Sequence, residues 1–95
     1  MQVSTTKTKI EHFIQTLLLA GRDGIEPRLL GMIVKTNVIN SYAQKLRTFN
    51  VTVKTLPVYS IPNFEDARAA LNRLNLYRVK RGARPLSGEC LIGWE

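Results

Sequence analysis

Five polar side chains in the middle of the chain have types and spacing that suit base recognition. They are Asn37, Asn40, Ser41, Gln44 and Lys45, on a segment whose periodicity predicts a helix from about residue 37 to 49. Asn and Gln can each form two hydrogen bonds with adenine, Lys can bond guanine, and Ser offers a smaller contact. We therefore expect this face to read base edges, with an ordinary solvated helix face as the alternative interpretation.

A second set of residues could hold the phosphates of a nucleic acid. It comprises Lys35, Thr36, Arg47 and Lys54 around the predicted helix 37–49, and a cluster at Arg78, Lys80, Arg81 and Arg84. Phosphate contacts add affinity without sequence preference. Cations also favour a helix C-terminus by about 0.3–1 kcal/mol each, but Arg84 lies beyond the predicted helix stop at Gly82. Whether residues 78–84 bind DNA or an acidic protein stays open.

The overall charge favours a polyanionic partner. The chain has 95 residues, with 14 Lys and Arg against 7 Asp and Glu, and a formal net charge of +7. Nucleic acid is the commonest partner of such a small basic domain, followed by acidic proteins and anionic membranes. The length allows one domain spanning residues 1–95, of which the polar residues 1–7 are predicted to be flexible.

The residues that enzymes and metal sites require are scarce. A single cysteine, Cys90, and a single histidine, His12, exclude an internal disulfide framework and a site built from several Cys or His ligands. The chain has no glycine-rich phosphate loop and no clear nucleophile–base set. We therefore expect a protein that is not an enzyme and that has no metal or cofactor.

The hydropathy pattern predicts neither a membrane span nor a signal peptide. No apolar run approaches the roughly 18–20 residues that cross a bilayer. Glu11, His12 and Gln15 interrupt the first apolar stretch, which therefore does not resemble a secretory leader. The expected location is the cytoplasm or the nucleoid, with no membrane partner.

Three helices are predicted to position the candidate face. Thr8 and Glu11 form a capping-box pattern before a helix over 9–20, which Gly21 ends. Pro27 suits the first turn of a short helix over 26–34. The apolar stripes of these helices and of helix 37–49, which includes Leu46, are predicted to meet in one core.

The remaining elements are predicted to be two strands and a further helix. Alternation over 51–59 indicates one strand, and residues 89–95 a second that could pair with it. Between them, Asn63 caps a helix that ends at Gly82. The expected fold is α+β and mainly α: a three-helix helix-turn-helix core, a short β-hairpin or wing, and an additional C-terminal helix.

The segment from Leu29 to Arg47 resembles the helix-turn-helix of winged-helix DNA-binding proteins, including small phage and plasmid regulators. The residues that carry the resemblance are Leu30, Ile33, Thr36, Ile39 and Leu46, and the similarity extends over about residues 9–58. It implies that helix 37–49 enters the major groove of double-stranded DNA.

The function we expect is sequence-selective binding of double-stranded DNA, in transcriptional regulation or as an accessory factor for replication or recombination. One small domain makes few base contacts, so a homodimer on two half-sites is expected. Two alternatives remain: a small basic module, such as an inhibitor or adaptor, that docks on an acidic protein, and an RNA-binding domain. Other proteins are therefore further candidate partners.

Overall fold

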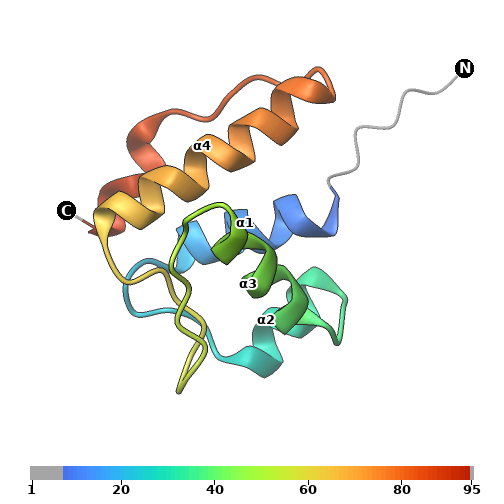
Figure 1. Ribbon diagram of the computed structural model, residues 1–95, viewed down its shortest axis with the longest axis vertical. Coiled ribbons are helices and arrows are strands. Elements are labelled where there is room, and N and C mark those ends of the chain that lie inside the picture. The colour runs from blue at the N-terminus through green and yellow to red at the C-terminus, as the bar shows by residue number, and fades with distance from the viewer. Residues whose placement is uncertain (1–7, 95) are drawn as a thin grey trace, which may run out of the picture.

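The computed structural model describes residues 8–94, which fold as a mainly helical domain (Figure 1). Its elements are α1 (Lys9–Ala20), α2 (Pro27–Val34), α3 (Ile39–Thr48), α4 (Phe64–Lys80) and the 3₁₀-helix η1 (Gly88–Trp94). The prediction for residues 1–7 lies outside the described part of the chain. No helix within residues 8–94 is both long and apolar enough to cross a membrane.

The predicted caps of the first and fourth helices are confirmed. The Thr8 hydroxyl accepts a hydrogen bond from the Glu11 backbone N–H, and the Glu11 carboxylate accepts one from the Thr8 backbone N–H. At α4, the Asn63 side chain accepts from the Asp66 backbone N–H at 2.9 Å. These bonds satisfy amide groups that lack partners in the first turn of a helix.

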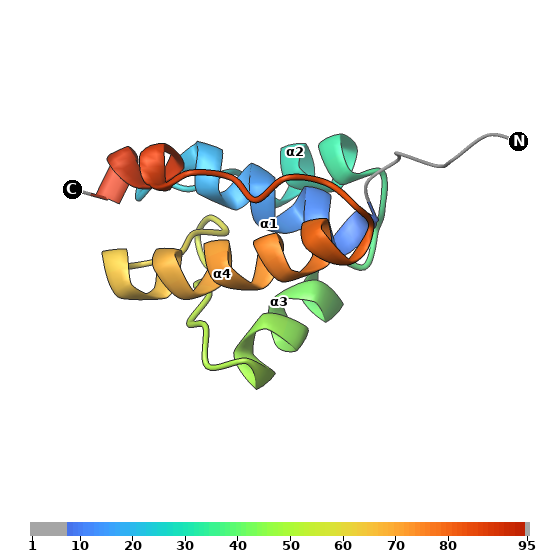
Figure 2. The same ribbon diagram turned by 90° about the horizontal axis from the view of Figure 1, so that it is seen from above.

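The core forms around α1, which contacts every other helix (Figure 2). The three predicted apolar stripes do meet in one cluster, and Leu46 of α3 is fully buried within it. The largest fully buried apolar side chains come from α1, α2, α3, α4, η1 and the loop before α4: Phe13, Ile14, Leu17, Leu30, Leu46, Ile61, Leu74 and Trp94. The inner face of α3 is therefore part of this one core.

A glycine sets the close approach of α2 to the turn that follows it. The Gly31 carbonyl accepts a hydrogen bond from the Thr36 backbone N–H at 3.0 Å. A Cβ at Gly31 would lie 3.0 Å from the Thr36 carbonyl oxygen, closer than most such contacts. Lys35 adopts a left-handed conformation, φ 61°, at the end of α2. The low helix propensity of Gly31 is thus offset by the tight turn that it permits.

The strand predicted over 51–59, and with it the β-hairpin or wing, is wrong. Residues 8–94 contain no strand, only isolated antiparallel bridges from Ile25 to Tyr59 and from Lys54 to Ser60. The chain doubles back through bends at residues 56–58, and Pro57 has no N–H to donate. Pairing therefore stops at single residues, and the segment before α4 is a loop with alternating buried positions at Val51 and Val53.

The second predicted strand, 89–95, is also wrong, because its described residues form η1. Leu91 and Trp94 are buried, and their spacing of three residues matches the three residues per turn of a 3₁₀-helix rather than the two-residue period of a strand. The Trp94 indole N–H donates to the Ile61 carbonyl at 2.8 Å. Glu95 lies outside the described residues. With both strands absent, the expected α+β class is corrected to mainly α.

Candidate nucleic-acid interface

The outer face of α3 carries the predicted base-reading side chains. Ala43 and Leu46 are buried on the inner face, whereas the five predicted residues are all exposed: Asn37, Asn40, Ser41, Gln44 and Lys45. Four of them lie on α3, with Asn40 adjacent to Gln44 and Ser41 adjacent to Lys45 at a spacing of four. Asn37 lies in the turn before α3, because the helix begins at Ile39 rather than at residue 37.

None of these five side chains has an intramolecular hydrogen bond or ion pair with the rest of residues 8–94. Their donors and acceptors are therefore left to solvent or to a ligand. The face thus combines exposure with unused hydrogen-bonding capacity, the two properties that direct base contact requires.

The predicted phosphate-binding residues that flank α3 in the chain are mostly exposed. Lys35 and Lys54 are exposed, and Arg47 is exposed with one guanidinium N–H donating to the Val53 carbonyl at 2.7 Å. This bond ties the end of α3 to the following loop and limits the freedom of the Arg47 side chain. The Thr36 hydroxyl already accepts a hydrogen bond from the Val38 backbone N–H at 3.2 Å.

The stretch of chain that contains α3 carries charge of one sign, a signal that the residue-by-residue reading of the sequence missed. Between Glu26 and Glu65 the chain contains no Asp or Glu, and its cations are Arg28, Lys35, Lys45, Arg47 and Lys54. The nearest described carboxylate with a bond to this region is Asp66, which accepts from the Thr52 backbone N–H at 3.2 Å. The charged side chains that this stretch itself offers to a polyanion are therefore all cations.

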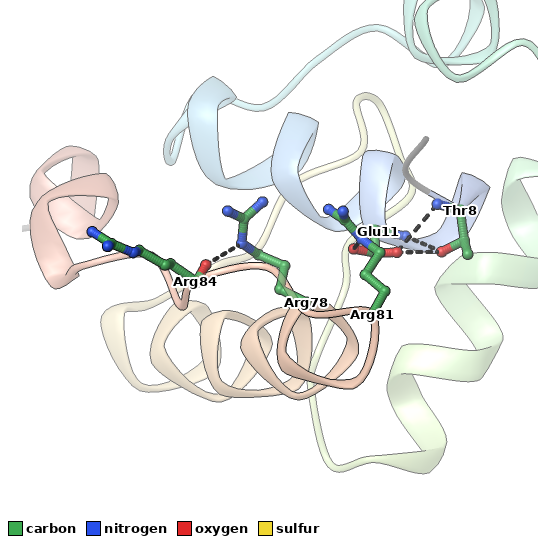
Figure 3. A network of polar contacts seen from close by, with 5 residues as sticks. All are labelled: Thr8, Glu11, Arg78, Arg81 and Arg84. Carbon is green, nitrogen blue, oxygen red and sulfur yellow. Dashed lines mark hydrogen bonds and ion pairs between the residues drawn. The ribbon is translucent and has the colours of Figure 1, made fainter. Parts of the chain in front are cut away.

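Two arginines of the cluster at residues 78–84 form polar contacts within the protein (Figure 3). The Arg81 guanidinium lies 2.9 Å from the Glu11 carboxylate, and the Arg78 Nε–H donates to the Arg84 carbonyl at 2.8 Å. Lys80 and Arg84 expose side chains without an intramolecular polar partner in residues 8–94. Phosphate contact by the cluster stays a prediction, and these two side chains are its freest members.

Glu11 is the acidic residue whose structural role the capping pattern understated. Its side chain is only 1% exposed, and the Arg81 ion pair joins the start of α1 to the end of α4. Burial alone raises the pKa of Glu11, but the hydrogen bonds from Arg81 and Thr8 and the Arg81 charge outweigh it, so that this pKa lies below the ordinary 4.5. Glu11 is therefore held as a carboxylate.

Two further observations concern the thiol and the acidic and histidine side chains of the described residues. Burial raises the pKa of the half-buried Cys90 thiol, which disfavours the nucleophilic thiolate. Across residues 8–94, no three His, Cys, Asp or Glu side chains come together as a potential metal site.

Comparison with known proteins found no match to this chain. No protein-family model matches the chain, and no curated protein or solved structure shows significant similarity to it. The function must therefore be argued from the residues of this chain.

Proposed function

We propose that this protein binds double-stranded DNA with sequence selectivity and inserts α3 into the major groove. The observation that carries the proposal is the set of five predicted base-reading side chains on and just before α3. They are exposed, have no polar bond to the rest of residues 8–94 and lie in a carboxylate-free stretch of the chain. The major groove, about 12 Å wide, admits one α-helix. In Figure 2, α3 lies at the lower edge of the molecule.

Asn40 and Gln44 are the central base-reading residues in this proposal. Their amide groups can donate and accept at once, as bidentate contact with adenine requires. Lys45 suits guanine, while Asn37 and Ser41 extend the contact along the groove. Discrimination is expected to amount to about 1–3 kcal/mol for each good bidentate contact.

The cations around α3 supply affinity that does not depend on sequence. Arg47, positioned by the Val53 carbonyl, and the exposed Lys35 and Lys54 would contact phosphates beside the groove. Lys80 and Arg84 would add contacts farther along the backbone. The resulting role is a non-catalytic regulator of transcription, or an accessory factor in replication or recombination, acting in the cytoplasm or nucleoid.

A protein-binding function has its own supporting observation on α4. Exposed Leu76 and Val79 lie beside exposed Lys80, so the outer face of α4 combines apolar and cationic side chains. Such a surface suits an acidic protein partner with an apolar centre. Under this alternative, DNA affinity would be weak, salt-sensitive and independent of sequence.

Selection of bound duplexes from a random pool, with a matched pool of RNA, tests the proposed function. The proposal expects a DNA motif to be enriched and the enriched duplex to bind more tightly than random duplex by a factor of 10³ or more, on the order of other specific DNA-binding proteins. Binding without enrichment would support the protein-binding alternative. Preferential enrichment of RNA would contradict the choice of DNA.

A further inference from the structure

Two shallow apolar grooves lie on either side of one exposed leucine of α1. The first, of about 400 Å³, lies between α1 and α2 and is lined by His12, Gln15, Thr16, Leu19, Ile25 and Ile33, with Ala20. The second, of about 240 Å³, lies between α1 and the segment leading into η1. Its lining includes Leu18, Leu19, Leu86 and Cys90. Leu19, which borders both grooves, is 74% exposed.

In a monomer, Leu19 exposes most of its apolar side chain to water. Burial of its apolar surface would be favourable by roughly 25 cal/mol for each Å² removed from water. Ile33, across the larger groove, is also partly exposed. A ridge flanked by hollows on the same face has the shape that a two-fold contact needs, because each ridge can enter the hollow of the other copy.

We propose that a second copy of this chain occupies these grooves, with the Leu19 side chain of each copy inserted beside that of the other. The inference rests on the proposed function in one respect: two linked copies would present two α3 helices to two DNA half-sites. Figure 2 shows α1, α2 and η1 along the edge opposite α3, so that the contact leaves α3 accessible.

The distribution of charge favours this face for contact between two copies. Each copy has a formal net charge of +7, so two copies repel each other unless they meet where carboxylates lie. The connection between the lining residues Ala20 and Ile25 carries exposed Asp23, and exposed Glu26 follows it directly. Glu89 lines the smaller groove. The α3 side, without carboxylates from residue 27 to 64, is unsuited to contact with a like copy.

A cation accompanies the carboxylates in the connection between α1 and α2. Arg22 is exposed there, next to Asp23 in the chain. The Arg22 guanidinium also donates to the Trp94 carbonyl, which fixes this connection against η1. Charges of both signs therefore lie in the connection between the lining residues Ala20 and Ile25, as the rim of a symmetric contact requires.

Analytical ultracentrifugation of the full chain, over a range of protein concentrations, tests the inference. The wild-type protein should sediment as a dimer that dissociates on dilution. Leu19→Glu should raise the dissociation constant of the dimer by about tenfold or more, because both copies would bury a carboxylate. Ile33→Glu, on the other wall of the larger groove, should act in the same direction.

Leu76→Glu is the matched control, since Leu76 is a 54% exposed leucine on a helix outside the grooves. It should leave the dimer unchanged, and circular dichroism should show that all variants remain folded. A wild-type protein that stays monomeric at every concentration would overturn the inference. So would equal effects of Leu19→Glu and Leu76→Glu.

The inference and the proposed function can fail separately. A dimer that Leu19→Glu dissociates but that selects no DNA motif would keep the inference and remove the DNA function. A monomer that selects a single motif would keep the DNA function and remove the inference. If both hold, the selected motif should occur twice, and Leu19→Glu should bind an isolated half-site as tightly as wild type does.

Discussion

The outer face of α3 and the 78–84 cluster are both rich in polar and cationic side chains, yet the fold uses them differently. On α3, no base-reading candidate bonds to another part of residues 8–94. In the cluster, Arg81 pairs with buried Glu11 and Arg78 holds the Arg84 carbonyl. Positive charge in a sequence therefore marks two roles, one available to a partner and the other already engaged in the fold.

The difference follows from what lies beneath each region. Beneath α3 the core is apolar, with Ala43 and Leu46, so its outer side chains have nothing internal to bond. Beneath the end of α4 lies the start of α1, where Glu11 is buried and requires a counter-charge. A cation near residue 81 is thus needed whether or not a ligand binds.

Replacement of Arg81 should have the largest effect on folding. Arg81→Ala leaves the Glu11 carboxylate buried and without its cation, which should lower the free energy of unfolding by about 3 kcal/mol. Lys80→Ala, one residue away and exposed, should change it by less than about 0.5 kcal/mol. Urea denaturation measures both. Equal stability of the two variants would mean that the ion pair between Arg81 and Glu11 contributes no more to folding than an exposed lysine does.

Stability at acid pH should report the same ion pair with a smaller effect. The pKa of Glu11 in the folded protein lies below its ordinary 4.5, so the unfolded chain binds the proton more readily. The stabilisation is present above about pH 4.5 and is lost as the pH falls through the lower, folded value. Glu11→Gln should therefore be less stable than wild type at neutral pH, with the difference shrinking below pH 4.5. A difference in stability between the two proteins that is constant with pH would show that the Glu11 charge does not contribute to it.

The exposed members of the cluster should affect DNA binding only through salt. If Lys80 and Arg84 contact phosphates, the variant with Gln at both positions should reduce the slope of log affinity against log salt by about 0.9 for each lost contact. Affinity for selected and random duplex should fall by a similar factor. Arg68→Gln, an exposed cation of α4 outside the predicted set, is the control. An unchanged slope would remove the cluster from the interface.

Local patterns in the sequence were sufficient to predict α1 to α4 and the exposed side of α3. Thr8, Glu11 and Gly21 delimit α1, Asn63 begins α4, and the apolar stripe containing Leu46 indicates which side of α3 faces outward. These signals lie within one helical turn of the feature that they predict, so they can be recognised without knowledge of the fold.

Features that depend on distant partners were not predictable in this way. Glu11 and Arg81 lie 70 residues apart, and nothing local to either residue indicates the pair. Trp94 reaches the Ile61 carbonyl, which favours a 3₁₀-helix over the strand that its neighbours suggest. The carboxylate-free stretch from residue 27 to 64 was visible in the sequence, but its meaning depends on α3 being exposed.

The most direct test of the central claim is the affinity of Gln44→Ala for the selected duplex and for random duplex. Because Gln44 is exposed and has no internal partner within residues 8–94, the variant should fold as wild type does. The account predicts a loss of about 1–3 kcal/mol on the selected duplex and almost none on random duplex. Asn72→Ala, which removes an exposed amide from α4, should affect neither. Equal loss on both duplexes, or no loss on either, would contradict base recognition by α3.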